Sequence, residues 1–284
     1  MGNRTFSEGI PLNKSIKDKT IILTGATGGI GRATAHALAK EGAVLILISR
    51  SPDKLGQLAE ELKGGYGIKT LICPMDIRDE MSCERAVGAV IEQYGKVDIL
   101  INIAGIGLFK SIEDTSKEEI ERVIQTNLLG PLYLCRAAIP FMKQQGFGHI
   151  LNISSVAGRR AFPQLTAYCA SKYGLIGLSD SLRAEMLKAG IPIRVTVINP
   201  PAVDTGFFDQ AGYTTYREDH PLVTLIPPEI IAEAVVKAIQ KPGTWEITLT
   251  LRARILNFLN KLSPRLIEYL NRKAGQAVKK KKSS

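Results

Sequence analysis

The sequence predicts an α/β fold, in which a doubly wound parallel sheet carries helices on both faces. Apolar, β-rich runs alternate with helical patterns from about residue 20 to residue 249. Strands that alternate with helices form parallel sheets. We find no internal repeat and no linker before residue 250. We therefore expect a polar leader at 1–18, one domain at 19–250, and a C-terminal extension at 251–284.

The predicted strands are short apolar runs that end at turn residues. The first run ends at Thr24-Gly25, the third ends at Pro74, and the fourth ends at Asn102. Glycine, proline and asparagine favour turns over extended strands. The predicted strands are 21–23, 44–48, 70–73, 97–101, 149–153, 193–198 and 245–249.

The predicted helices fill the intervals between these strands. Pro52, directly after Ser51, suits the first turn of the second helix. Gly130-Pro131 predicts a break inside the long fourth helical segment. The predicted helices are 32–41, 52–62, 81–94, 118–145, 164–188 and 228–240.

A glycine-rich turn joins the first strand to the first helix. Its spacing is Gly25-x-x-x-Gly29-x-Gly31. Glycines allow a tight turn and a close approach of the backbone to a pyrophosphate, and the helix N-terminus offers free N–H groups and a positive dipole end. The motif therefore indicates a dinucleotide site, although a tight turn without a ligand also fits these residues.

Two charged residues follow the second and third strands. The second strand ends at Ser49-Arg50, where an acid would select a free ribose 2′-hydroxyl. The Arg50 guanidinium instead suits a 2′-phosphate, and Thr27 could donate a further hydrogen bond. This pattern favours NADP over NAD; the alternative is a solvated loop arginine. Asp76 could bind an adenine amino group or cap a helix.

A serine, a tyrosine and a lysine are spaced for hydride-transfer chemistry. Ser155 follows the fifth strand, Tyr168 comes thirteen residues later, and Lys172 lies one helical turn further on. A carbonyl that accepts hydride needs an acid, and a neighbouring ammonium lowers the high pKa of a tyrosine. A serine hydroxyl can stabilise the charge that develops on the substrate oxygen. A solvated helix face is the alternative for an isolated Tyr-x-x-x-Lys.

These motifs together resemble the short-chain dehydrogenase/reductase family over about residues 18–248. They occur in the family's order: the glycine turn, Asp76, Asn102-x-Ala104-Gly105, Asn127, Ser155 and Tyr168-x-x-x-Lys172. The resemblance implies a three-layer Rossmann fold and catalytic Asn127, Ser155, Tyr168 and Lys172. It implies that Asn127 bends a helix and anchors a water that links the lysine to solvent.

The resemblance also sets the expected cofactor contacts. Ile103 and Pro201 depart from the family's Asn-Asn-Ala-Gly and Pro-Gly, and a second proline predicts a stiffer loop beside the nicotinamide. The predicted NADP(H)-binding residues are Gly25, Thr27, Gly29, Ile30, Gly31, Ser49, Arg50, Asp76, Ile77, Asn102, Ala104, Gly105, Tyr168, Lys172, Pro200, Val203 and Thr205. We expect no metal, no nucleic acid, and a homodimer or homotetramer.

The segment 206–225 lies where such enzymes carry a substrate lid, and it is aromatic. Its aromatic residues are Phe207, Phe208, Tyr213 and Tyr216, while Phe109 and Phe162 lie on other loops. This composition favours an apolar carbonyl or alcohol substrate, such as a steroid, retinoid, lipid-derived or xenobiotic compound. The alternative is that these aromatics only pack the lid. Arg159 and Arg160 are the charged residues nearby.

The extension after residue 250 is basic and amphipathic. The chain carries a net charge of +10, of which +9 follows residue 251. An apolar stripe comprises Leu251, Ile255, Phe258, Leu259 and Leu262; Leu266, Ile267 and Leu270 begin a second segment, and Lys279 to Lys282 follow. This pattern predicts attachment to an anionic membrane surface. The alternative is a helix docked on protein.

Hydropathy and cysteine spacing limit the classes of protein and of site to which the chain can belong. No run of eighteen apolar residues predicts a membrane span, and the four cysteines lack metal-ligand spacing. We expect a cytoplasmic protein, free or peripheral on a membrane. The leading function is an NADPH-dependent carbonyl reductase or alcohol dehydrogenase. The alternatives are a 3-oxoacyl-thioester reductase and a non-catalytic NADP-binding scaffold at a membrane.

Overall fold

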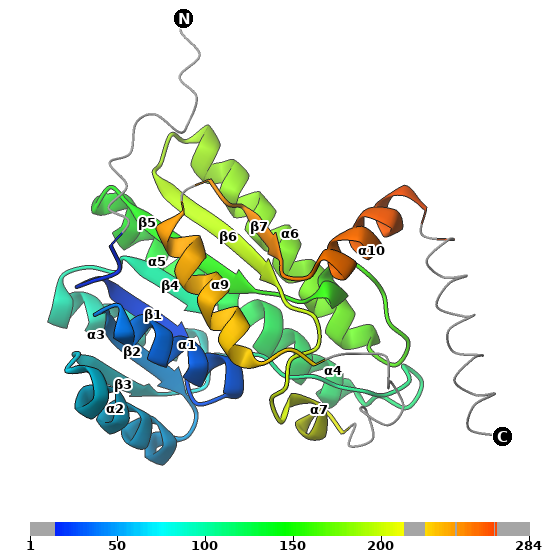
Figure 1. Cartoon of the computed structure of the whole chain (residues 1–284), viewed down its shortest axis with the longest axis horizontal. Coiled ribbons are helices and arrows are strands. Elements are labelled where there is room, and N and C mark those ends of the chain that lie inside the picture. The colour runs from blue at the N-terminus through cyan, green and yellow to red at the C-terminus, as the bar shows by residue number, and fades with distance from the viewer. Residues whose placement is uncertain (1–14, 213–224, 242, 264, 266–284) are drawn as a thin grey trace, which may run out of the picture.

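A computed structural model describes residues 15–212, 225–241, 243–263 and 265. It confirms the predicted α/β Rossmann fold. The seven strands form one sheet in the order β3-β2-β1-β4-β5-β6-β7, and every neighbouring pair is parallel (Figure 1). The strands are β1 Thr20–Thr24, β2 Val44–Ser49, β3 Thr70–Pro74, β4 Ile99–Asn102, β5 Gly148–Ile153, β6 Ile193–Asn199 and β7 Glu246–Thr248.

Helices cover both faces of the sheet (Figure 1). They are α1 Gly29–Lys40, α2 Pro52–Tyr66, α3 Glu80–Tyr94, α4 Lys117–Ile124, α5 Gly130–Gln144, α6 Thr166–Lys188, α7 Phe207–Gln210, α9 Pro228–Gln240 and α10 Leu251–Leu262. Two short segments complete the described elements, the π-helix η1 Gln125–Leu129 and the 3-10 helix η2 Val156–Gly158.

The hydrophobic core has one layer on each face of the sheet. Along β1, Ile21 and Leu23 pack with α1, α2 and α9, whereas Ile22 packs with α3, α5 and α6. Successive strand side chains point to opposite faces, so a fully buried strand is apolar on both. This explains why the strands of the sheet interior are continuous apolar runs.

The observed elements differ from the predicted ones at a few ends. Helix α2 continues four residues past its predicted end at 62, because Gly67 closes it in the left-handed conformation (φ +67°). The predicted break near Gly130 is the π-helical turn η1. Asp79, not Asp76, caps α3. The helix-cap alternative for Asp76 is therefore wrong.

Some predictions fall on residues outside the described part. These are the leader up to residue 14, Tyr213 and Tyr216 of the lid, and Leu266, Ile267, Leu270 and Lys279 to Lys282 of the extension. Within the part that the structure describes, no helix is both long and apolar enough to cross a membrane.

Candidate active site

The carboxyl ends of the strands surround a cavity of about 690 Å³. It spans the point between β1 and β4 where the strand order reverses, which is where open α/β sheets bind ligands. Every predicted cofactor-binding residue except Asn102 lines this cavity. Of the predicted catalytic residues, Ser155, Tyr168 and Lys172 line it, and Asn127 does not.

The glycine turn fits a pyrophosphate. A Cβ on Gly31 would lie 2.0 Å from the Gly25 carbonyl oxygen, and a Cβ on Gly29 would lie 2.4 Å from Cγ2 of Thr205, so neither position admits a side chain without movement. Helix α1 begins at Gly29 with no side-chain cap and no acid in its first turn. Its first N–H groups and positive dipole end are therefore suited to an anion in the cavity.

Two buried side chains hold the loops that surround this turn. The Thr24 hydroxyl accepts hydrogen bonds from the N–H groups of Ile103 and Ala104 at 3.0 and 3.1 Å. The Asn102 amide, which does not line the cavity, donates to Oδ1 of Asn152 at 2.8 Å. Asn102 thus joins β4 to β5.

Asn127 occupies the π-helical turn and is fully buried. Its Oδ1 accepts from the Ile106 N–H at 2.8 Å, and its Nδ2 donates to the Ile106 carbonyl at 2.9 Å and to Oγ of Ser171 at 3.0 Å. These contacts hold the 105–107 loop against α6. In this structure Asn127 positions the site and does not border the cavity.

Tyr168 and Lys172 lie together on α6, with Ser155 opposite. Burial raises the pKa of Tyr168 to about 12, and a hydrogen bond with Ser155 acts in the other direction. Burial lowers the pKa of Lys172 to about 8. The Lys172 ammonium lies 5.8 Å from the centre of the Tyr168 ring and donates to the Ile153 carbonyl at 3.0 Å. Tyr168 is thus a phenol at neutral pH and can act as a proton donor.

Ser154, which precedes Ser155, makes a different set of contacts. The Ser154 hydroxyl donates to the main-chain carbonyl of Lys172 at 3.0 Å, which ties the end of β5 to α6. Ser155 accepts from the Ala157 N–H at 3.1 Å, and both serines border the cavity. The Ser154 hydroxyl is thus engaged in a structural contact, whereas Ser155 also has a hydrogen bond with Tyr168.

The far end of the cavity is positively charged. Arg50 and Lys54, from the end of β2 and the first turn of α2, both line it. Asp76 also lines it, but the Arg78 guanidinium binds its carboxylate at 2.6 Å and, as the largest cause, holds the pKa of Asp76 below its usual value. Because Arg78 pairs with this acid, Arg50 and Lys54 are left to give this end a positive potential.

The other side of the cavity, beside Tyr168, is aromatic. Four phenylalanines line it: Phe109, Phe162, Phe207 and Phe208. The ring centres of Tyr168 and Phe207 lie 5.7 Å apart, as do those of Phe109 and Phe208. A Cβ on Gly107 would lie 2.6 Å from the Phe207 ring, so the short helix α7 packs closely over this loop. The predicted lid residues Phe207 and Phe208 are part of the cavity wall.

Comparison with known proteins decides the family. The sequence profile described as short chain dehydrogenase matches residues 19–214. The chain is a short-chain dehydrogenase/reductase. It is therefore an oxidoreductase that interconverts alcohol and carbonyl groups with a nicotinamide cofactor.

Its relatives include two bacterial proteins and one archaeal enzyme of known structure. The oxidoreductase YxnA of Bacillus subtilis is 31% identical over 262 residues, which cover 92% of this chain and 73% of that protein. The ketoacyl reductase HetN of Nostoc is 36% identical and covers 81% of this chain and 78% of its own length. An alcohol dehydrogenase of Thermococcus sibiricus, solved with 5-hydroxy-NADP, has 30% identity and a TM-score of 0.73, over 82% of this chain and 96% of its own.

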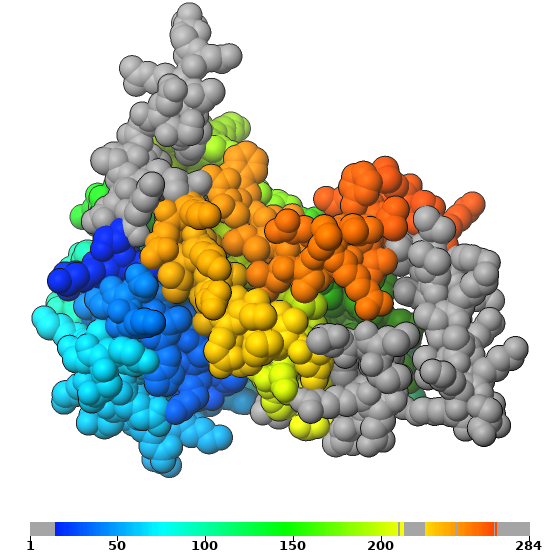
Figure 2. Space-filling model, in the orientation of Figure 1, coloured from blue at the N-terminus to red at the C-terminus, as the bar shows by residue number. Residues whose placement is uncertain are grey.

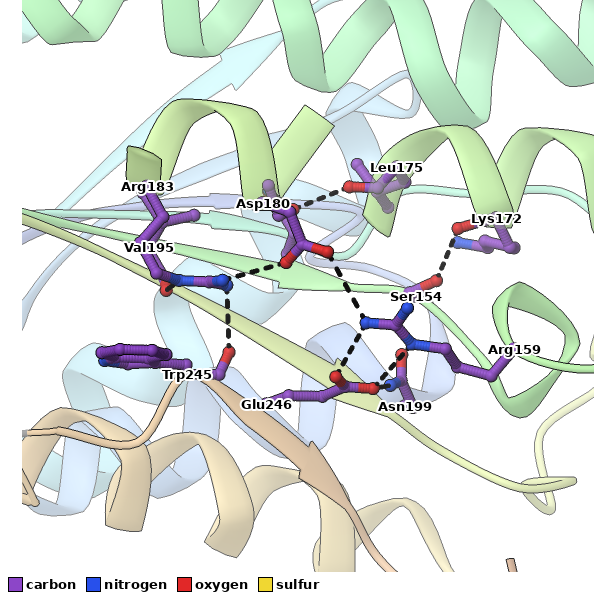
Figure 3. A network of polar contacts seen from close by, with 12 residues as sticks. Ser154, Arg159, Lys172, Leu175, Asp180, Arg183, Val195, Asn199, Trp245 and Glu246 are labelled. Carbon is purple, nitrogen blue, oxygen red and sulfur yellow. Dashed lines mark hydrogen bonds and ion pairs between the residues drawn. The ribbon is translucent and has the colours of Figure 1, made fainter. Parts of the chain in front are cut away.

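In this dehydrogenase an ion-pair network holds the loop that follows Ser155 (Figure 3). The Arg159 guanidinium donates to both carboxylate oxygens of Glu246 on β7, at 2.9 and 2.8 Å, and lies 3.7 Å from Asp180 on α6. Asn199 donates to the same Glu246 at 2.7 Å. Arg159 is thus engaged within the protein and does not charge the substrate side of the cavity.

Several residues of the dehydrogenase site were not predicted. Thr24 connects the end of β1 to the loop after β4 through hydrogen bonds with residues almost eighty positions away. Lys54 lines the cavity together with Arg50 because α2 starts beside it. Gln164 lines the cavity in the left-handed conformation (φ +62°), which is uncommon for a residue with a side chain. The lysine in the first turn after Arg50 could have been identified from the sequence, and Thr24 directly precedes the glycine motif, but no sequence signal indicated Gln164.

Proposed function

We propose that this enzyme is an NADP(H)-dependent carbonyl reductase or alcohol dehydrogenase for apolar substrates. The distribution of charge in one continuous cavity carries this proposal. Among the residues that the structure describes, the charged ones in its lining are Arg50, Lys54 and Asp76 at one end and Lys172 beside Tyr168, whereas the wall facing Tyr168 is aromatic. Such a wall favours a substrate whose surface around the reacting carbon is hydrocarbon.

The protein's own groups provide the proton chemistry in this proposal. A nicotinamide supplies hydride in reduction and accepts it in oxidation. Tyr168, a phenol at neutral pH, donates a proton to the developing alkoxide, while the Ser155 hydroxyl stabilises the same oxygen. The protonated Lys172 then stabilises the resulting phenolate. In the oxidative direction the same phenolate acts as the base.

The positive end of the cavity supports NADP over NAD. A 2′-phosphate is a dianion, and the Arg50 guanidinium can bind it bidentately with Lys54 as a second charge. Ser49 takes the place of an acid that would repel this phosphate. The Thermococcus relative was solved with an NADP derivative, which is in line with this preference.

The name of HetN favours one competing substrate class, a 3-oxoacyl thioester. Against it, +9 of the net charge of +10 follows residue 251, outside the residues 19–214 that match the family. A non-catalytic scaffold is a third proposal. It is disfavoured because Tyr168 and Lys172 are both present and both border the cavity.

Two measurements test the proposal. Arg50→Asp should weaken NADPH binding by about tenfold or more and NADH binding far less, because a charge-assisted hydrogen bond contributes roughly 1.5–3 kcal/mol. Arg85→Asp, an equal charge change on the exposed side of α3, is the matched control and should alter neither. Equal binding of NADH and NADPH by the wild type would contradict the NADP assignment.

The substrate class is tested by following NADPH oxidation with a panel of carbonyl compounds. The panel should contain apolar ketones, small sugars and a 3-oxoacyl thioester. We expect the largest kcat/KM with the apolar ketones. Preference for the thioester would replace our proposal with the HetN-like activity, and no turnover with any substrate would favour a scaffold.

A further inference from the structure

Helix α10 contacts the protein through its least apolar side. Ala253 and Asn257 are 7% and 8% exposed, and Asn260 donates to the Arg159 carbonyl at 3.0 Å. The Thr250 hydroxyl caps the helix by accepting from the Ala253 N–H at 3.2 Å, and Arg254 donates to the Thr248 carbonyl at 2.8 Å. These small and polar groups fix the orientation of the helix on the protein.

The apolar stripe of the same helix faces outward. Leu251, Ile255, Phe258 and Leu262 are 72%, 50%, 61% and 67% exposed, and their spacing of four, three and four residues places them on one line along the helix. We call these four residues the α10 stripe. Figure 2 shows α10, in orange, projecting at the edge of the molecule. Leu256 and Leu259, the other leucines of the helix, are half-buried, so Leu259 of the predicted stripe is not part of this exposed line. The docking of α10 therefore leaves the α10 stripe exposed.

Basic residues of α10 border this stripe. At about 100° per residue, Arg252 lies on one flank of the stripe, and Arg254 and Lys261 lie on the other. All three are exposed, as is Arg265, and residues 251–265 include no Asp or Glu. The sequence that follows, 266–284, adds six basic residues and one acidic residue. An apolar line between rows of cations is complementary to an anionic lipid surface.

We propose that α10 is an interfacial anchor, whose α10 stripe inserts into an anionic lipid leaflet while its flanking cations bind the headgroups. Membrane attachment was expected from composition, but the structure identifies the attaching side chains and leaves them pre-oriented away from the body. A second copy is a poorer occupant, because a two-fold contact along the stripe would bring like-charged flanks together. Four side chains also supply far less than the roughly 800 Å² per partner of a stable dimer.

Vesicle sedimentation of the full-length protein tests this anchor. With phosphatidylcholine vesicles containing phosphatidylserine we expect binding that weakens as salt rises, and little binding to phosphatidylcholine alone. Ile255→Gln with Phe258→Gln should lower the partition coefficient about tenfold or more, because their apolar area no longer leaves water. Met81→Gln with Ile230→Gln, which changes exposed apolar residues of α3 and α9, should leave it unchanged.

The charge contribution has its own pair of variants. Lys261→Gln with Arg265→Gln should reduce binding by about fivefold for each charge at low salt, whereas Lys63→Gln with Lys143→Gln on α2 and α5 should not. NADPH binding checks that each variant is folded. This readout does not depend on the substrate class proposed above.

Three outcomes would overturn the anchor. The first is that the wild type does not bind anionic vesicles. The second is that the wild type binds them but the Ile255 and Phe258 changes do not weaken the binding. The third is that the wild type forms an oligomer, seen in size-exclusion chromatography, which these changes dissociate. The second would assign membrane attachment to residues 266–284. The third would assign the stripe to a second copy of the chain.

Discussion

Replacement of the buried Lys172 by methionine should change how the stability of the enzyme depends on pH. Burial lowers the pKa of Lys172 to about 8, against 10.5 in its ordinary state. Between these values the unfolded chain binds a proton that the folded chain lacks, so the free energy of unfolding rises with pH. Methionine has a similar length and no charge, so the variant lacks this contribution.

The size of the effect follows from the width of that window. Between pH 7 and pH 10, the unfolded chain holds one more proton at Lys172 than the folded chain over about two pH units. Each such pH unit changes the free energy of unfolding by about 1.36 kcal/mol. From pH 7 to pH 10, the free energy of unfolding of the wild type should therefore rise by about 2–3 kcal/mol relative to that of the variant. Loss of the hydrogen bond to the Ile153 carbonyl destabilises the variant at every pH and does not affect this difference.

Urea unfolding of both proteins without cofactor, in reducing buffer at pH 7, 8, 9 and 10, measures the effect. Unfolded-state tyrosines begin to ionise near the upper limit, and the raised pKa of Tyr168 then lowers the stability of both proteins, so this contribution cancels in the comparison. The thiols titrate alike in both proteins and cancel in the comparison. Parallel stability curves would refute the conclusion that Lys172 is held in a desolvated site.

Two further predictions concern the chemistry and the glycine turn. Tyr168→Phe should lower kcat for carbonyl reduction by at least about a hundredfold with nearly unchanged NADPH affinity, because it removes only the proton donor; near wild-type turnover in a steady-state assay would exclude Tyr168 as the acid. Gly29→Ala should weaken NADPH binding and destabilise the protein by about 1–3 kcal/mol, because its Cβ would meet Thr205. Gly56→Ala, on α2 with nothing within 4 Å, is the control and should stabilise the fold by up to about 1 kcal/mol; equal effects in thermal denaturation would contradict the clash.

Much of the fold follows from local patterns in the sequence. A strand buried on both faces is a continuous apolar run, and Ile21-Ile22-Leu23 shows this directly. The helix starts at Pro52 and Pro228 follow from the tolerance of proline in a first turn. The right-handed parallel crossover then restricts the arrangement of the strands, and their carboxyl ends meet at one edge. That edge collects most of the predicted cofactor residues.

The partners of individual polar side chains were decided by tertiary structure. Arg159 and Glu246 are 87 residues apart, and nothing local in either segment indicates that they pair. The structure places the amides of Asn102 and Asn127 against Asn152 and Ile106, and no local pattern indicates these contacts. Hydrogen bonds of this kind depend on which strands and loops become neighbours, and a linear pattern does not contain that information.

The sequence by itself determined the doubly wound sheet, the glycine turn and the pairing of Tyr168 with Lys172, because each depends on spacing within one element or on its immediate neighbours. Only the tertiary structure decided the orientation of α10. Periodicity showed that this helix has an apolar side and a polar side, but not which one meets the protein. Ala253 and Asn257 are small enough for close contact, and Asn260 donates to the Arg159 carbonyl, so this side meets the body and the α10 stripe faces outward.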